Sequence, residues 1–127
     1  MYVAPEVILG SYNEKIDEWS SGVVLYTMFT GYPPFQSKSD IKETLKLIKL
    51  GVYSKDLDEY KKLSNDAKSL ITALLTLDPE KRISAVDALH HPWIKKYQKS
   101  SKLSKAKNKN KTEEKQPESI ENDRLIR

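Results

Sequence analysis

The sequence has no cysteine, two histidines and four glycines. Without cysteine the chain has neither a disulfide framework nor a thiolate metal site. The histidines, His90 and His91, are adjacent and cannot form a zinc site alone. The longest apolar run, residues 23–29, contains a threonine and is far too short to cross a bilayer. No secretory signal is found either, so we expect a soluble protein of the cytoplasm, with the nucleus as an alternative, and no membrane contact.

Charge is distributed unevenly along the chain. Lysine and arginine number 22 against 18 aspartates and glutamates, a net charge of +4. Residues 1–94 carry 11 basic against 13 acidic side chains, whereas residues 95–127 carry 11 against 5. Because the first part is slightly acidic, it gives no reason to expect a nucleic-acid partner. Residues 95–111 contain eight lysines and hardly any apolar side chain, which predicts a disordered basic tail over residues 98–127.

The organised part, residues 1–97, is predicted to be all-α, because no segment alternates between apolar and polar residues with a period of two. Pro5 starts a short helix. Residues 17–30 are apolar around most of a helix circumference, which predicts a buried helix ended by Gly31. Asp40 and Glu43 form a capping-box pattern.

Two further helices are bounded by serine caps. The helix after the capping box ends at Gly51, and the next begins at Ser64 and stops before Asp78. The last begins at Ser84 and runs to His90. In the helix that ends at Gly51, the residues expected to face the core are Ile41, Leu45 and Ile48. In the helix that begins at Ser64, they are Ala67, Leu70, Ile71, Leu74 and Leu75.

Five short motifs then follow one another in a fixed order. They are Ala4-Pro5-Glu6, Asp17-x-Trp19-x-x-Gly22, residues 31–35 (GYPPF), Asp78-Pro79-x-x-Arg82 and His91-Pro92-Trp93. This series resembles the C-terminal part of the large lobe of a eukaryotic serine/threonine protein kinase domain, from the A-P-E motif onward. Within that family, GYPPF together with DPEKRISAVDALHHPWI is most similar to the calcium/calmodulin-dependent and calcium-dependent kinases.

The resemblance implies structural roles for particular residues. Glu6 would pair with Arg82, and Asp17, in the motif with Trp19 and Gly22, would accept hydrogen bonds from the backbone of a catalytic loop. On residue chemistry alone, the Asp17 carboxylate would stabilise the N-terminus of its helix through the helix dipole and by capping backbone N–H groups.

Three other positions near these motifs also carry information. Tyr2 and Val3 would be the remnant of the loop that receives the substrate. Glu18 departs from the family, which usually has an apolar residue between the aspartate and the tryptophan. Thr27 is neutral where some kinases carry an acid that reads a substrate arginine, which argues against that way of selecting basic substrates.

The residues that perform phosphoryl transfer in this family are not in the sequence. It has no G-x-G-x-x-G, no strand lysine motif, no H-R-D and no D-F-G, which a kinase needs to hold ATP and Mg²⁺ and to position the acceptor. We therefore expect no catalytic, ATP-binding or metal-binding residue in this chain, although the resemblance implies ATP and Mg²⁺ for a complete family member. Nor does the sequence contain a calcium-binding D-x-D-x-D-G loop.

The expectation is a kinase fragment that is inactive alone and whose partners are the missing N-terminal kinase portion and, by family, a protein substrate or regulator. The alternative is a non-catalytic binding or scaffold module that uses the surface around residues 40–50. With so much of the large lobe missing, the isolated chain should be marginally stable.

Overall fold

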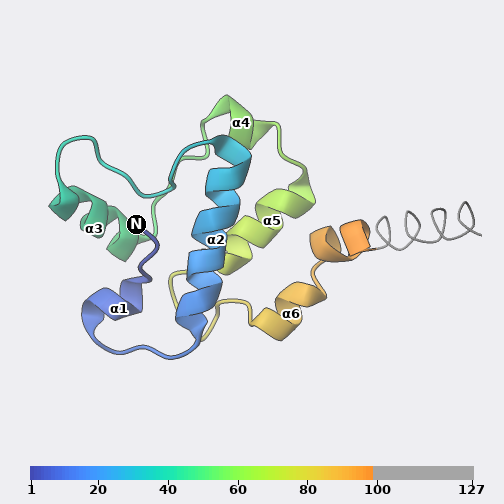
Figure 1. Ribbon diagram of the computed structural model, residues 1–127, viewed down its shortest axis with the longest axis horizontal. Helices are drawn as coiled ribbons and strands as arrows, with labels where there is room; N and C mark the ends of the chain where they lie inside the picture. Colours follow the sequence, from blue (N-terminus) through green and yellow to red (C-terminus); the bar gives the residue numbers. More distant parts are fainter. Residues whose placement is uncertain (99–127) are drawn as a thin grey trace, which may run out of the picture. The chain divides into compact units, whose positions relative to one another are not determined.

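The computed structural model describes residues 1–98, and the chain divides into two units, Met1–Ile94 and Lys95–Arg127. The described residues form helices and no strand, so the all-α prediction is confirmed for them. The predicted tail beyond residue 98 lies outside the described residues. The helices shown in Figure 1 are α1 (Pro5–Leu9), α2 (Lys15–Thr30), α3 (Ile41–Leu50), α4 (Asp58–Lys61), α5 (Asn65–Leu74) and α6 (Ala85–Leu89), and a last helical stretch covers residues 92–98.

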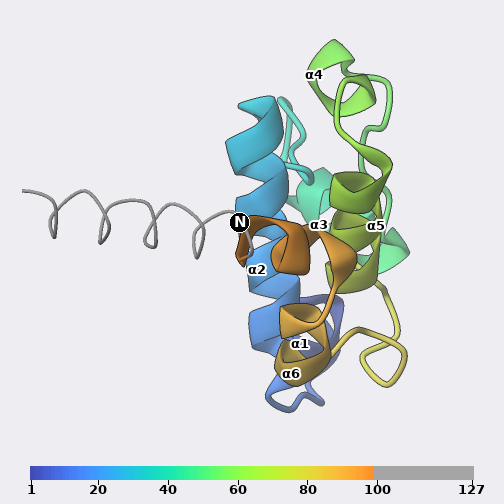
Figure 2. The ribbon, with the colours of Figure 1, turned by 90° about the vertical axis from the view of Figure 1, so that its right-hand side faces the viewer.

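Helix α2 is the central element of the first unit. It begins two residues earlier than predicted and ends, as predicted, at Gly31, whose φ of 79° is a left-handed conformation that glycine adopts without strain. Figures 1 and 2 show α5 running beside it. The side chains of Trp19, Val23 and Tyr26 are buried on this side of α2.

Helix α3 differs from its prediction in two details. The Asp40 side chain accepts a hydrogen bond from the Lys42 N–H, as a helix cap does. Glu43, however, does not complete the capping box, because its carboxylate accepts hydrogen bonds from the hydroxyls of Ser37 and Ser39. Ile41, predicted to face the core, is 62% exposed, whereas Ile48 is buried.

Helices α5 and α6 begin at the predicted serine caps. The Ser64 hydroxyl accepts from the Ala67 N–H, and the Ser84 hydroxyl accepts from the Asp87 N–H. All five residues of the α5 region that were expected to face inward are buried. The four-residue α4, between α3 and α5, was not predicted.

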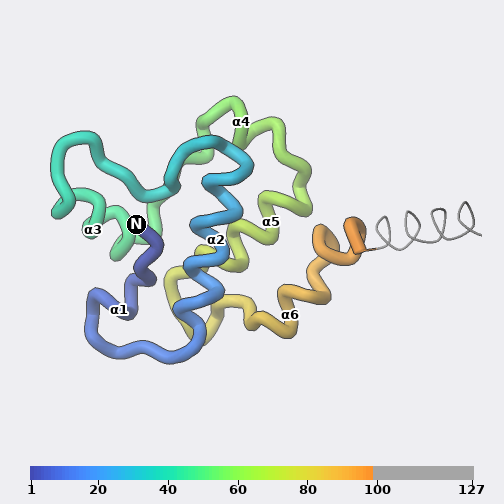
Figure 3. The backbone as a smooth tube through the Cα atoms, viewed as in Figure 1, coloured from blue at the N-terminus to red at the C-terminus, as the bar shows by residue number. Residues whose placement is uncertain are grey.

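The core of this unit gathers around α2. Trp19 stacks on Phe35, and Tyr26 contacts the rings of Tyr53 and Tyr60. In Figure 3 the chain leaves α1 through a wide loop and enters the N-terminal end of α2. None of the described helices is long and apolar enough to span a membrane.

Candidate functional site

Glu6 and Arg82, far apart in the sequence, form a buried ion pair. Glu6 lies in the first turn of α1, and Arg82 lies in the segment between α5 and α6. The Arg82 guanidinium donates to both carboxylate oxygens of Glu6, at 2.8 Å and 3.0 Å. Such bidentate pairing fits the planar guanidinium and is stronger than a single contact. The pair that the resemblance implies is therefore present, and it joins the beginning of the unit to its last third.

The remaining donors of Arg82 are also used. Its Nε donates to the Thr76 carbonyl at 2.9 Å, and its terminal nitrogens donate to the carbonyls of Lys15 at 2.8 Å and Leu77 at 3.3 Å. With the two bonds to Glu6, these contacts occupy all five N–H groups of the guanidinium. A buried charge whose donors are all paired avoids most of the cost of desolvation.

Trp19 extends this arrangement into the core. The Arg82 guanidinium lies 5.0 Å from the Trp19 ring centroid, within the range of a cation–π contact. The Trp19 ring also stacks on the Phe35 ring, with ring centroids 5.3 Å apart and an angle of 12° between the ring planes. The column Glu6–Arg82–Trp19–Phe35 thus connects α1, α2 and the segments that follow α2 and α5. All four residues belong to the sequence motifs, but the motifs did not predict the stacking of Trp19 on Phe35.

Gly22 provides the close approach between α2 and α5. A β-carbon at this position would lie 2.8 Å from the Leu74 β-carbon and 2.9 Å from a methyl group of Leu75. Those distances are shorter than van der Waals contact, so only glycine allows the two helices to pack at this separation. Gly22 is therefore a packing residue.

The two acids at the start of α2 behave differently from expectation. Asp17 is exposed in the first turn of α2, where the helix dipole favours a carboxylate, but its side chain caps no N–H group of the described residues. The capping expectation is therefore wrong for Asp17. Glu18 is buried instead, and one of its oxygens accepts a hydrogen bond from the Ala85 N–H at 3.0 Å, at the start of α6.

One face of α2 is open to solvent, contrary to the prediction of a helix buried on nearly every side. The exposed residues Asp17, Ser21, Val24 and Met28 recur at helical spacing, so they form a single stripe. Val24 is 44% exposed and Met28 is 76% exposed. Val24 and Met28 are therefore two exposed apolar side chains on the same helix face.

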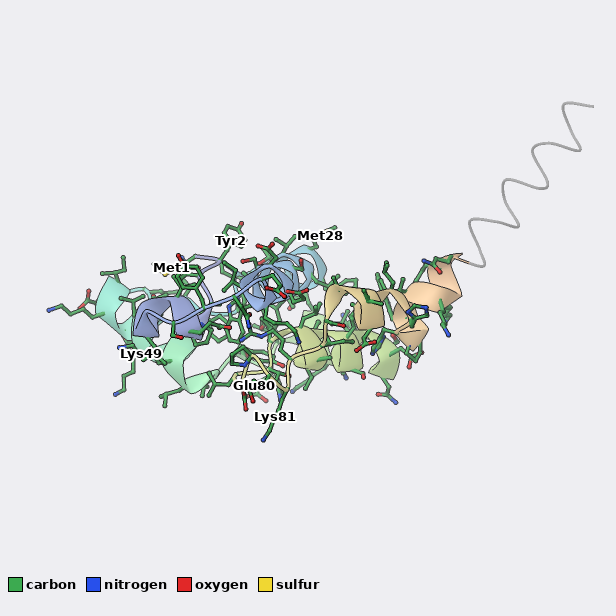
Figure 4. The ribbon with its side chains drawn as sticks, turned by 90° about the horizontal axis from the view of Figure 1, so that it is seen from below. Met1, Tyr2, Met28, Lys49, Glu80 and Lys81 are labelled. Carbon is green, nitrogen blue, oxygen red and sulfur yellow. The ribbon has the colours of Figure 1, made fainter. Side chains whose placement is uncertain are left out.

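Tyr2 and Val3, the two predicted remnants of a substrate loop, are both exposed. Tyr2 lies at the edge of this open face, and its carbonyl accepts a hydrogen bond from the Ser20 hydroxyl at 2.9 Å. Figure 4 shows the side chains of Tyr2 and Met28 on the same side of the molecule. Together with Val24, Leu25 and the exposed polar residues of α2, Tyr2 lines a groove of about 520 Å³.

A second groove opens on the neighbouring side of α2. It has a volume of about 340 Å³ and lies between α2, α5, α6 and residues 93–94. Its lining is apolar except for Asp17, Glu18 and Ser21. Because Asp17, Ser21 and Leu25 line both grooves, the two form one continuous surface along α2.

The histidines make ordinary structural contacts. A ring nitrogen of His91 lies 3.2 Å from the Ser69 hydroxyl, and one of His90 lies 2.9 Å from the Val86 carbonyl. Among residues 1–98, no group of three or more histidine or acidic side chains is placed to hold a metal ion.

Comparison with known proteins identifies a family. The model of the protein kinase domain matches residues 1–94. The chain is 47% identical over 102 residues to calcium-dependent protein kinase 3 of Plasmodium yoelii yoelii, which covers 80% of this chain and 19% of that protein. It is 47% identical over 94 residues to calcium-dependent protein kinase 4 of Plasmodium falciparum (isolate 3D7), covering 74% and 18% of the two chains. Calcium-dependent protein kinase 5 of the same organism is 40% identical over 111 residues, covering 87% and 19%. The chain thus spans less than a fifth of the length of these relatives.

Proposed function

Because this chain belongs to the protein kinase domain family, close to the calcium-dependent kinases, we propose that it supplies the C-terminal helices of a serine/threonine kinase large lobe. In this role the column of Glu6, Arg82, Trp19 and Phe35 is the rigid frame. The open face of α2 is the surface on which the remainder of the kinase domain packs. The reaction of the assembled domain is transfer of a phosphoryl group from ATP to a serine or threonine of a protein.

The observation that carries this proposal is the contrast between the two sides of α2. On one side Trp19 and Val23 are fully covered, and Gly22 allows backbone contact with α5. On the other side Val24, Met28 and the Asp17 carboxylate are uncovered. A partner that fits must offer an apolar surface to the first two residues and N–H donors to the third.

The chemistry itself is assigned to residues outside this sequence. In a complete member of the family, ATP and Mg²⁺ are held by a Gly-rich loop, a strand lysine and the aspartates and asparagine of the H-R-D and D-F-G segments. None of these motifs is in the 127 residues. We therefore propose that the chain alone does not transfer phosphate and binds neither ATP nor Mg²⁺.

A two-part assay tests the proposal. The kinase-domain portion of calcium-dependent protein kinase 4 that precedes its own A-P-E motif is joined genetically to residues 1–127. ADP formation is then measured with ATP, Mg²⁺ and a serine-containing peptide. We expect activity from the joined protein and none from either part alone. ADP formation by residues 1–127 alone would overturn the proposed division of labour.

A matched pair of variants locates the contact. Met28→Lys places a charge in the open face of α2, whereas Leu9→Lys changes an equally exposed apolar residue of α1, 74% against 76% exposed. We expect the first substitution to reduce the activity of the joined protein at least tenfold and the second to leave it within twofold. Equal effects would argue against packing on the open face. A joined protein that is folded and inactive would favour the alternative, a non-catalytic kinase-like binding or scaffold module.

A further inference from the structure

The Glu18 carboxylate has a hydrogen-bond partner at only one of its two oxygens. Glu18 is 9% exposed, and its Oε1 accepts a hydrogen bond from the Ala85 N–H at 3.0 Å. The second oxygen, Oε2, is shielded from solvent and accepts no hydrogen bond from any residue in the range 1–98. A buried carboxylate oxygen without a donor is costly, so a group that supplies a donor there stabilises the protein.

Glu18 belongs to the wall of the groove between α2, α5, α6 and residues 93–94. This groove has a volume of about 340 Å³, and apart from Asp17, Glu18 and Ser21 its lining is apolar. Among the described residues that line it, two are acids and none is a lysine, arginine or histidine. The terminal torsion of a glutamate side chain is broad, so the Glu18 carboxylate can turn toward a donor that enters the groove.

The groove continues the surface on which the missing part of the kinase domain is proposed to pack. Asp17, Ser21 and Leu25 line both this groove and the one beside the open face of α2. An element that covers the open face is therefore adjacent to Glu18. The acid at position 18 departs from the apolar residue usual in the family, so the requirement for a donor belongs to this chain in particular.

We propose that a helix of the missing kinase portion packs into this groove and places a lysine or arginine against Glu18 Oε2. This pairing rests on the proposed function, in which that portion covers α2, and it adds the chemistry of the covering element. The helix covers Leu25, Leu70 and Leu89 with apolar side chains, and its single cation forms a charge-assisted hydrogen bond with the carboxylate.

A neutral donor and a second copy of the chain fit the groove less well. A neutral N–H or O–H group satisfies the oxygen but leaves the negative charge of Glu18 buried, whereas an ammonium or guanidinium compensates both. A two-fold dimer through this groove places the same patch of both copies face to face. Asp17 and Glu18 of one copy then approach those of the other, and like charges repel.

The experiment measures binding of a fluorescent helical peptide to the 127-residue chain. This lysine peptide has leucines at i, i+4 and i+7, a lysine at i+3 and glutamines on its opposite face, so that the lysine lies among the leucines. A second peptide carries norleucine in place of the lysine, which keeps the aliphatic stem and removes the ammonium. The measured quantity is the affinity for the lysine peptide divided by the affinity for the norleucine peptide.

Matched variants assign this affinity ratio to Glu18. Glu18→Gln keeps an oxygen for the Ala85 N–H but removes the charge, and it should lower the ratio about tenfold or more, as loss of a hydrogen bond to a charged group does. Glu14→Gln removes the same charge from an exposed position one turn earlier and should change the ratio less than about twofold. Circular dichroism verifies that each variant is as helical as the parent chain.

Two measurements on the unsubstituted chain give the same information without a variant. The side-chain carboxyl carbon of Glu18, followed by NMR, should shift more on addition of the lysine peptide than on addition of the norleucine peptide. The affinity ratio should persist as salt rises from about 50 to about 200 mM, because a buried pair is screened much less than an exposed one. A ratio that falls to one at the higher salt would assign the attraction to the exposed Asp17 and contradict the pairing.

The joined kinase shows whether the kinase portion occupies the groove. With the groove covered, it should bind the lysine peptide about tenfold more weakly than the 127-residue chain does. Equal binding by the two proteins would show that the groove stays open in the joined kinase, and would overturn the kinase portion as its occupant.

Other outcomes would also overturn the proposal. An affinity ratio unchanged in Glu18→Gln, or no saturable binding of the lysine peptide, would remove the pairing. Displacement of that peptide by n-octylamine with higher affinity would assign the groove to a small amine, and dimers abolished by Glu18→Gln would assign it to a second copy. The proposed function is read separately from ADP formation by the joined kinase. An active joined kinase without the lysine preference refutes the pairing alone, so the two failures are distinguishable.

Discussion

Gly22 of α2 lies directly against Leu74 of α5, so close that a β-carbon at position 22 would stand 2.8 Å from the Leu74 β-carbon. The glycine has ordinary helical backbone geometry, so its value lies in the missing side chain rather than in conformational freedom. The contact packs α2 against α5 three residues after Trp19. Trp19 lies against the Arg82 guanidinium, which in turn pairs with Glu6, so the contact supports this frame.

Replacing Gly22 by alanine should lower the free energy of unfolding by about 1–2 kcal/mol. Overpacking of a tight interface costs about 1–3 kcal/mol, and the better helix propensity of alanine returns up to about 1 kcal/mol. Urea unfolding followed by circular dichroism measures the change. Ser21→Ala, an exposed neighbour in the same helix, serves as the control and should change stability little. A Gly22→Ala variant as stable as the parent would show that α2 and α5 can separate without cost.

Arg82→Lys should be far from conservative. Lysine cannot form the bidentate contact with Glu6 or reach the carbonyls of Thr76, Lys15 and Leu77 together. We expect a loss of about 3 kcal/mol in the free energy of unfolding, because the change breaks a buried pair and leaves acceptors unpaired.

The exposed neighbour Lys81 offers the control for this change, since Lys81→Ala should alter stability by no more than about 0.5 kcal/mol. A double variant with Glu6→Gln should lose less than the sum of the two single losses, because the residues share one interaction. Additive losses would mean that the two side chains act independently.

Glu43 should contribute a pH-dependent part of the stability. Hydrogen bonds from Ser37 and then Ser39 hold the pKa of this carboxyl below its ordinary value of 4.5, with a smaller contribution from Lys46. A pKa lowered by folding means that the ionised group favours the folded state. This contribution is therefore present above pH 4.5 and is lost as the pH falls through the lower folded-state pKa.

An NMR titration of the Glu43 side-chain carbon measures that pKa directly. In a variant carrying Ser37→Ala and Ser39→Ala it should return toward the ordinary value. Glu43→Gln should make the stability less dependent on pH in the acid range. A Glu43 pKa at or above 4.5 in the unsubstituted chain would contradict the contacts seen at the start of α3.

The elements predicted correctly from the sequence are those set by neighbouring residues. Ser64 and Ser84 cap their helices, and Gly31 and Gly51 end theirs in the left-handed conformation, because these signals act within one turn of the chain. Arg82 could be assigned to Glu6 only through the order of the motifs in the family. No local pattern connects two residues so far apart.

What the sequence did not predict has tertiary causes. No prediction was made for the Glu18 side chain, whose carboxylate accepts the Ala85 N–H at the start of α6, a contact that the sequence of α2 does not reveal. Ile41 has the right helical spacing for the core but lies in the first turn of α3, where nothing covers it. Glu43 had the position of a capping-box acid, yet two serine hydroxyls in the preceding loop compete for it.

The isolated chain should be only marginally stable, because α2 leaves Val24 and Met28 in water. Each Å² of uncovered apolar surface forgoes roughly 25 cal/mol of stabilisation, and net stabilities of small domains are only about 5–15 kcal/mol. We expect a broad thermal transition, binding of a hydrophobic dye and concentration-dependent association for residues 1–127. The joined kinase should instead melt sharply at a higher temperature. Val24→Lys with Met28→Lys should reduce dye binding and association of the isolated chain, since both charges replace exposed apolar groups. A sharp, cooperative transition from a monomer of the unsubstituted chain would show that the open face of α2 needs no partner.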